Sequence, residues 1–193
     1  MRIGLFGGTF DPPHWGHLIL AEWIRCEGKL DKVWLAPARV PPHKVGRKLT
    51  DEWLRFEMVK LACADDKFIV ASDCDLVHDR KPSYTIDLLD ELSAKFPDDE
   101  FVLIVGADSI VEFTTWHNWQ EILDRYDVYG LLRPNFDVRA ADKMVLEKVK
   151  IFKSPLIELS STMIRQRVKE GKSIRFMVPA AVEKFIYEKK LYV

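Results

Sequence analysis

The stretch RIGLFGGTFDPPHWGH, residues 2–17, places an apolar run directly before a loop rich in glycine, proline and histidine. The apolar run ends at two glycines and is predicted to be a buried strand. Residues 17–30 then carry apolar side chains at near-helical spacing, with Gly28 as a C-cap, so a helix is expected to begin near His14 or Trp15. A strand, a tight loop and a helix in this order are typical of a parallel α/β sheet.

The rest of the chain alternates short apolar strands with amphipathic helices. Strands are predicted over 32–37, 68–72, 100–108, 127–134 and 150–154, and helices over 50–64, 84–96, 119–126, 142–149, 161–171 and 179–192. Short apolar runs of this kind are typical of strands covered on both faces. We therefore expect one α/β domain over 1–193, a doubly wound, Rossmann-like parallel sheet with C-terminal helices. Such a sheet binds ligands outside the carboxyl ends of its strands, where the loop 7–17 lies.

Composition favours a compact protein with a mixed-charge surface. Hydrophobic residues make up 48% of 193, and 29 basic residues nearly balance 30 acidic ones. This balance gives no reason to expect a nucleic-acid or membrane partner. We expect no signal peptide and no membrane span, because the apolar runs are too short. The three cysteines form no C-x-x-C pair, which favours reduced thiols and a cytoplasmic location.

The loop after the first strand has the composition of an anion site. Gly7 and Gly8 allow a ligand to approach the backbone closely. The first N–H groups of the following helix favour a negative charge, and His14 and His17, three positions apart, would lie on one face of it. Two alternatives stay open from these residues alone: a metal site, and a tight turn capped by Asp11 with surface histidines. The Walker A and G-x-G-x-x-G spacings are absent.

A second stretch, LSSTMIRQRV at 159–168, has a similar chemistry. Its hydroxyls and the N–H groups of a helix start, followed one turn later by an arginine, would make a second anion pocket. The residues concerned are Ser160, Ser161, Thr162 and Arg165. A Ser/Thr helix cap with an incidental surface arginine is the alternative.

Together these stretches resemble the signatures of the nucleotidyltransferase superfamily. His14-Trp15-Gly16-His17 matches its T/H-x-G-H motif, and 159–165 matches I-S-S-T-x-I-R with leucine in the first position. Further segments are similar to the bacterial nicotinate mononucleotide adenylyltransferases of NAD synthesis: PARVPPHK (37–44), PSYTIDLL (82–89), GADSIVEFTTWHNW (106–119) and VPAAVEKFIYEKKLY (178–192). The resemblance runs nearly end to end.

The resemblance implies the transfer of an adenylyl group from ATP to nicotinate mononucleotide, which gives nicotinate adenine dinucleotide and pyrophosphate. It implies catalytic roles for His14, His17 and Arg165, and Mg²⁺ bound mainly through the ATP phosphates. The ATP-binding residues that the resemblance implies are Gly7, Gly8, Thr9, Phe10, His14, His17, Gly106, Asp108, Ser160, Ser161, Thr162 and Arg165. The mononucleotide-binding residues that it implies are Lys44 near the phosphate, Thr85 at the nicotinate carboxylate and Trp116 stacked on the pyridine ring.

Several alternatives stay open. Nicotinamide mononucleotide or phosphopantetheine could be the acceptor, and a nucleotide sensor would bind ATP without turnover. The basic, proline-rich loop 38–49 is a candidate lid. Arg133 is a candidate phosphate contact, whereas His43, His78 and His117 receive no role. The oligomeric state is open, a homo-oligomer included.

Overall fold

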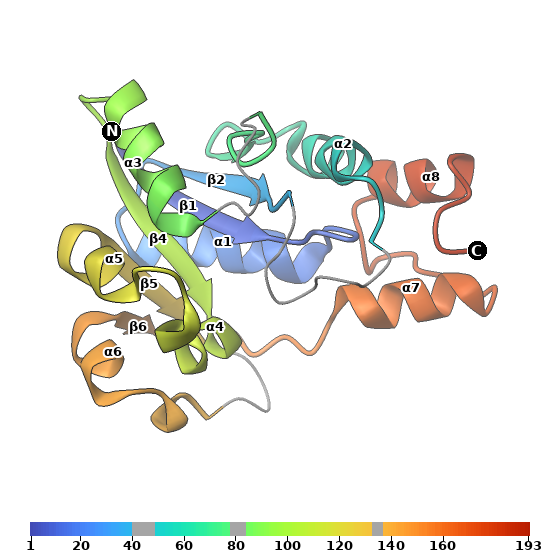
Figure 1. Ribbon diagram of the computed structural model, residues 1–193. Coiled ribbons are helices and arrows are strands. Elements are labelled where there is room, and N and C mark those ends of the chain that lie inside the picture. Colours follow the sequence, from blue (N-terminus) through green and yellow to red (C-terminus); the bar gives the residue numbers. More distant parts are fainter. Residues whose placement is uncertain (40–48, 78–83, 133–136) are drawn as a thin grey trace.

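The computed structural model describes residues 1–39, 49–77, 84–132 and 137–193. Its sheet contains β1 (Arg2–Gly8), β2 (Lys32–Pro37), β3 (Ile69–Ala71), β4 (Glu100–Gly106), β5 (Asp127–Leu131) and β6 (Lys150–Phe152). Neighbouring strands are all parallel and follow the order β3-β2-β1-β4-β5-β6 (Figure 1). This order reverses direction between β1 and β4, which is the switch point of a doubly wound sheet. The predicted fold class is confirmed.

Helices cover both faces of this sheet, and two more lie beside it. They are α1 (Trp15–Glu27), α2 (Glu52–Cys63), α3 (Thr85–Lys95), α4 (Ala107–Val111), α5 (Trp119–Arg125), α6 (Lys143–Lys148), α7 (Ser161–Lys169) and α8 (Ala180–Glu188), with 3-10 turns η2 (Phe113–Thr115) and η3 (Val138–Ala140). Alternate residues of β4 enter different cores: Leu103 packs with residues of α3 and α5, whereas Ile104 packs with residues of α1 and α2. Burial on both faces explains why the strands are short continuous apolar runs.

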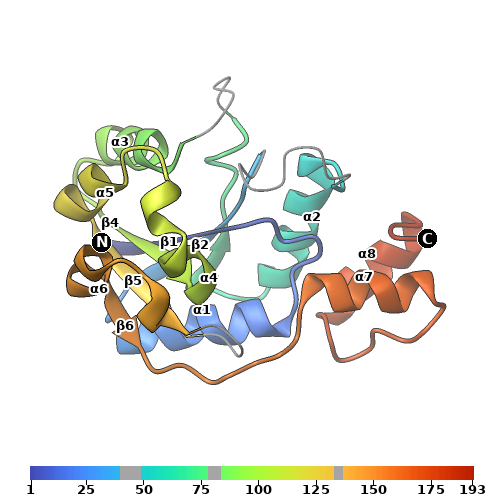
Figure 2. The same cartoon turned by 60° about the horizontal axis from the view of Figure 1, so that its bottom comes forward.

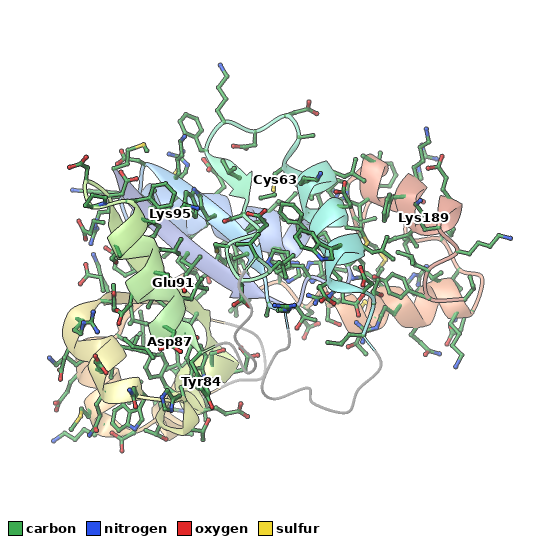
Figure 3. All side chains as sticks on the ribbon, turned by 45° about the horizontal axis from the view of Figure 1, so that its top comes forward. Cys63, Tyr84, Asp87, Glu91, Lys95 and Lys189 are labelled. Atoms are coloured by element: carbon green, nitrogen blue, oxygen red, sulfur yellow. The ribbon has the colours of Figure 1, made fainter. Side chains whose placement is uncertain are left out.

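Helix α3 shows how one amphipathic element is fixed to the sheet. Ile86, Leu89 and Leu92 are buried in the core at helical spacing. Asp87 and Glu91 follow Tyr84 along its polar side (Figure 3). This orientation brings the first turn of α3 to the carboxyl ends of the central strands.

The structure differs from the sequence prediction mainly at element ends. Gly7 and Gly8 do not end β1; they continue it and pair with Ala36 and Pro37 of β2. The strand predicted over 100–108 ends at Gly106, because the chain turns directly into α4. Neither α4 nor the 3-10 turns were predicted, since elements of five residues or fewer carry too little periodicity to detect.

The C-terminal helices pack beside the sheet rather than on it. Figures 1 and 2 show α7 and α8 side by side at one end of the molecule, next to α2. A separate apolar cluster holds them there, formed by Met58, Ile164, Val168, Ile174, Val178, Val182 and Ile186. The start of α7 is thereby brought to the loop that follows β1.

Candidate active site

The loop after β1 ends in a pair of stacked histidines. His14 is the N-cap of α1, and its backbone N–H donates to Nδ1 of His17 at 3.2 Å. The two imidazole rings stack with their centroids 3.7 Å apart. His14 is only 4% exposed, so it is not a surface residue. The prediction of a helix start that places both histidines on one face is confirmed, and the alternative of Asp11 as the helix cap is wrong.

Gly16 is required by this packing. A Cβ atom at this position would lie 3.0 Å from both Cε1 and Nδ1 of His14 and 3.3 Å from Cγ2 of Ile157. Such distances are shorter than ordinary carbon contacts, so any side chain would displace the His14 ring. The glycine of the His-x-Gly-His motif therefore has a steric explanation.

The start of α7 lies directly against this loop. Oγ of Ser161 donates to the carbonyl of Pro12 at 2.8 Å, and Nη1 of Arg165 donates to the carbonyl of Asp11 at 2.7 Å. Nη2 of Arg165 also contacts Oγ1 of Thr162 at 3.2 Å. The two predicted anion motifs, 149 residues apart between Pro12 and Ser161, thus meet in space.

Some of the predicted ligand groups have structural partners of their own. Oγ of Ser160 caps α7 by accepting from the Met163 N–H at 3.2 Å, as the capping alternative expected. Phe10 is buried, and its ring meets His17 edge-on with centroids 4.9 Å apart. The Phe10 ring thus supports the second histidine, while its backbone adopts a φ of 48°.

A buried arginine that the sequence did not reveal holds the loop after β1 through hydrogen bonds to backbone carbonyls. Arg55 of α2 is 1% exposed, and Nη1 donates to the carbonyl of Thr9 at 2.8 Å. Its other nitrogens donate to the carbonyls of Ala38 and Thr50, at 2.8 and 3.0 Å. Burial lowers the pKa of this guanidinium, and its carbonyl partners replace the lost water. An arginine in an amphipathic helix looks like a surface residue in sequence, so no signal could have identified it.

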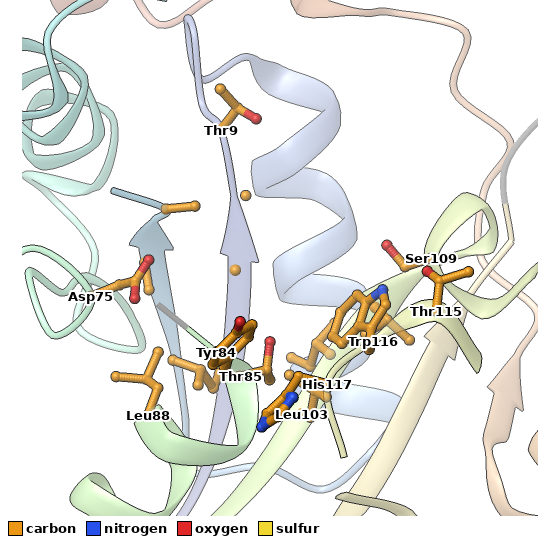
Figure 4. Close-up of a pocket in the computed structure, with 17 residues that line it drawn as sticks. Thr9, Asp75, Tyr84, Thr85, Leu88, Leu103, Ser109, Thr115, Trp116 and His117 are labelled. Atoms are coloured by element: carbon orange, nitrogen blue, oxygen red, sulfur yellow. The ribbon is translucent and has the colours of Figure 1, made fainter. Parts of the chain in front are cut away.

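Beside the loop lies a pocket of about 270 Å³ at the carboxyl ends of β1, β2 and β4 (Figure 4). It is lined by Leu5, Gly7, Gly8, Thr9, Ala36, Ala38, Asp75, Tyr84, Thr85, Leu88, Leu103, Ile104, Val105, Ser109, Thr115, Trp116 and His117. Its position at the switch point between β1 and β4 is where a doubly wound sheet binds its ligand. The structure therefore brings Thr85 and Trp116 together with the glycines of the first motif.

Trp116 contributes an aromatic surface to this pocket. One face of the indole stacks on Phe113, with centroids 5.0 Å apart and planes 18° apart. Its Nε1 atom is buried and has no hydrogen-bond partner among the described residues. Near it, the rings of Tyr84 and His117 stack at 4.2 Å. Asp75, Tyr84 and His117 are pocket residues to which the sequence prediction gave no role.

The remaining predicted residues lie close to the pocket or outside the described chain. Gly106 ends β4 and caps α4, and Asp108 is half-buried in the first turn of that helix. Neither residue lines the pocket, although their neighbour Ser109 does. Lys44 and Arg133 lie outside the described residues, as do His43 and His78.

Metal-binding clusters and membrane-spanning helices are both absent from the part of the chain that the structure describes. The described residues contain no group of three or more histidine, cysteine, aspartate or glutamate side chains arranged to hold a metal ion. None of their helices has the length and apolar character needed to cross a membrane.

A sheet of this order, with a His-x-Gly-His loop after β1 and a Ser-Ser-Thr helix start beside it, defines a nucleotidyltransferase. Residues 5–167 match the cytidylyltransferase-like family model. A probable nicotinate-nucleotide adenylyltransferase of Desulfitobacterium hafniense (strain Y51) is 42% identical, covering 99% of this chain and 95% of the relative. The nicotinate-nucleotide adenylyltransferase of Bacillus subtilis (strain 168) is 37% identical, covering 99% and 98%. The chain belongs to the nicotinate-nucleotide adenylyltransferase family, and the resemblance found in the sequence is confirmed.

Solved structures agree with this fold. The Plasmodium falciparum nicotinic acid mononucleotide adenylyltransferase complexed with NaAD superposes with a TM-score of 0.81 at 19% identity, covering 99% of this chain and 97% of that one. A putative nicotinate-nucleotide adenylyltransferase from Vibrio parahaemolyticus gives a TM-score of 0.71 at 22% identity, covering 99% and 94%.

Proposed function

We propose that this protein transfers the adenylyl group of ATP to nicotinate mononucleotide, releasing pyrophosphate. The main support for this proposal is that the aromatic pocket and the loop that carries the histidines are continuous in the chain. Gly7, Gly8 and Thr9 line the aromatic pocket and lead directly into the loop that presents His14 and His17. An acceptor whose ring lies in the pocket would therefore place its phosphate beside the loop that holds the phosphates of ATP.

The reaction needs alignment and charge stabilisation rather than a catalytic base. An oxygen of the mononucleotide phosphate is already ionised at neutral pH. It attacks the α-phosphorus of ATP, a new P–O bond forms, and the bond to the β-phosphate oxygen breaks. The protein must hold the attacking and leaving oxygens in line and stabilise the charge that develops on the phosphates.

We assign the α- and β-phosphates to the loop after β1. His14 and His17 would donate from their imidazoles, and the backbone N–H groups of Gly8, Thr9 and Phe10 would complete the cradle. Since Nδ1 of His17 accepts from the backbone of His14, the proton of a neutral His17 ring belongs on Nε2. That tautomer makes Nε2 the donor toward a phosphate.

The β- and γ-phosphates are assigned to the start of α7. Ser161, Thr162 and Arg165 are the residues concerned, and the N-terminus of the helix adds favourable backbone dipoles. The contacts of Ser161 and Arg165 with the carbonyls of the first loop give these side chains a second task, which is to hold the two phosphate-binding segments together. Ser160 would contribute through its backbone, and Gly106 and Asp108 would lie at the ATP ribose.

The acceptor is assigned to the aromatic pocket. The indole of Trp116 would stack on the pyridine ring, and the first turn of α3 at Thr85 would meet the carboxylate through backbone and hydroxyl donors. Lys44 is proposed to meet the mononucleotide phosphate.

Mg²⁺ is proposed to enter with ATP. The described residues hold no cluster of carboxylates or imidazoles for a resident metal, which suits an ion coordinated mainly by phosphate oxygens and water. The three cysteines are unpaired, which supports the proposed cytoplasmic location.

The test is pyrophosphate release from MgATP with three acceptors in parallel: nicotinate mononucleotide, nicotinamide mononucleotide and phosphopantetheine. Fast release with the nicotinate compound alone supports the proposal. Preference for another acceptor would keep adenylyl transfer but overturn the roles of Thr85 and Trp116. ATP binding without release for any acceptor would favour a nucleotide sensor.

A further inference from the structure

The tail after α8 turns back to the loop that carries the histidines. The hydroxyl of Tyr192 donates to Oδ1 of Asp11 at 2.7 Å, across 181 residues of sequence. It also lies 3.9 Å from Sδ of Met58 on α2. Burial, together with the carboxylate of Asp11, raises the pKa of the Tyr192 phenol, so the hydroxyl stays protonated and remains a donor.

Asp11 accepts hydrogen bonds from several separate segments of the chain, which hold the loop after β1 in place. Its side chain is buried, with 2% of the residue exposed, so its carboxylate needs donors in place of water. The N–H of Thr50 contributes a long contact to Oδ2 at 3.4 Å, whereas the Tyr192 hydroxyl gives a short one. Arg165 holds the backbone carbonyl of the same residue. Asp11 is therefore fixed by its side chain and its main chain together.

The chain between Asp11 and His14 is stiff. It consists of Pro12 and Pro13, whose rings fix their φ angles. Because two backbone angles between them are fixed, a displacement of Asp11 is less easily absorbed before it reaches His14. His17 follows, because its ring stacks on that of His14.

We propose that Tyr192 is a positioning residue for adenylyl transfer: its hydroxyl holds the buried carboxylate of Asp11 and thereby fixes the loop that presents His14 and His17 to the phosphates. The proposal rests on the proposed function of this loop. Tyr192 lies far from the acceptor pocket in sequence and is not among the residues that line it. Its effect should fall mainly on the ATP side of the reaction.

The experiment compares Tyr192→Phe with Tyr187→Phe. The first change keeps the ring and removes only the hydroxyl; the second makes the same change on α8 at a residue that is 47% exposed. Because small misplacements of reacting groups are costly, Tyr192→Phe should lower kcat by about tenfold and weaken MgATP binding several-fold. The KM for nicotinate mononucleotide should stay within twofold, and Tyr187→Phe should match the wild type.

A double variant separates positioning from simple stabilisation. If Tyr192 acts through the histidine loop, its removal should cost less in a His17→Ala background than in the wild type. An equal loss of kcat in both backgrounds, or a kcat within twofold of wild type with only a lower Tm, overturns the proposal. Should Tyr192→Phe fail to fold, Asp11→Asn probes the same contact, since it keeps an acceptor for the hydroxyl and should retain more activity than Asp11→Ala.

The wild-type protein distinguishes this proposal from the function on which it rests. Absence of turnover in the wild type with nicotinate mononucleotide overturns the proposed reaction. In that case the positioning role of Tyr192 is tested by the dissociation constant for MgATP, measured by calorimetry without acceptor. An unchanged constant in Tyr192→Phe overturns the positioning role, and a several-fold weaker one supports it.

Discussion

The imidazole rings of His14 and His17 stack with their planes 23° apart, and the backbone of the first residue donates to the ring of the second. Neither ring can therefore move without disturbing the other. This coupling makes the pair one rigid group of donors at the start of α1. Rigid donors stabilise developing charge well, because they need no reorganisation during the reaction.

Replacement of His17 by alanine is expected to lower kcat by about 10²–10³, the usual cost of losing one preorganised donor. The protein should stay folded, which thermal unfolding will check. Near-normal turnover by His17→Ala would contradict the assignment of the phosphates to this loop.

Gly16→Ala tests the steric role of the motif glycine. At an ordinary helical site this change stabilises by about 1 kcal/mol. Here the new Cβ would lie 3.0 Å from the His14 ring, so the ring must shift. We expect kcat to fall at least tenfold with little change in Tm, because a misplaced donor costs more than the helix gains. Unaltered kinetics would show that the His14 position does not matter for turnover.

Trp116→Ala is expected to raise the KM for nicotinate mononucleotide by about tenfold, because stacking of an aromatic ring on a base contributes roughly 1–3 kcal/mol. Trp116→Phe should recover part of this loss. Trp53→Ala serves as the control, since Trp53 is exposed on α2 and does not line the pocket. A KM unchanged in Trp116→Ala would remove the stacking role.

Arg55→Met is expected to lower the free energy of unfolding by about 3 kcal/mol or more, since several buried carbonyls lose their donors together. Urea denaturation measures this change. Arg139→Met provides the matched control, because the Arg139 side chain is 87% exposed and should leave the midpoint unchanged. Equal midpoints for the two variants would mean that Arg55 does not hold the loop.

Thiol accessibility gives a prediction that depends on pH. Burial raises the pKa of Cys63 to about 12 and that of Cys74 to about 11, so at pH 8 both are almost wholly protonated (Figure 3 marks Cys63). Cys26 is exposed, although its hydrogen bond to Glu22 also raises its pKa. A chromogenic disulfide reagent at pH 8 should therefore label Cys26 first. The other two should react only in denaturant, or increasingly as the pH rises toward their pKa values. Rapid labelling of all three in the native state would contradict the burial described here.

The sequence was sufficient for the fold class, because apolar runs and helical periodicity repeat along most of the chain. It also indicated the histidine pair, since His14 and His17 are three positions apart at a helix start. That the two motifs meet was implied only by the family resemblance, which assigned both to ATP. The sequence could not reveal Arg55 or the contact between Tyr192 and Asp11. These depend on tertiary packing, and a buried arginine or tyrosine has no local pattern that distinguishes it from an exposed one. The alternative in which Asp11 caps the helix was wrong for the same reason. His14 is the N-cap of α1, and the Asp11 side chain accepts a hydrogen bond from Tyr192.

The described residues that line the pocket proposed for the acceptor fall between Leu5 and His117, whereas the contacts that fix the histidine loop come partly from Ser161, Arg165 and Tyr192. The two halves of the active centre thus differ in when they can be assembled during synthesis. The pocket can form once its strands and helices have emerged, but the loop must wait for the final helices and the tail. A chain truncated before Ser161 would therefore keep every described residue of the pocket and lose the contacts of Ser161, Arg165 and Tyr192 with the proposed phosphate loop.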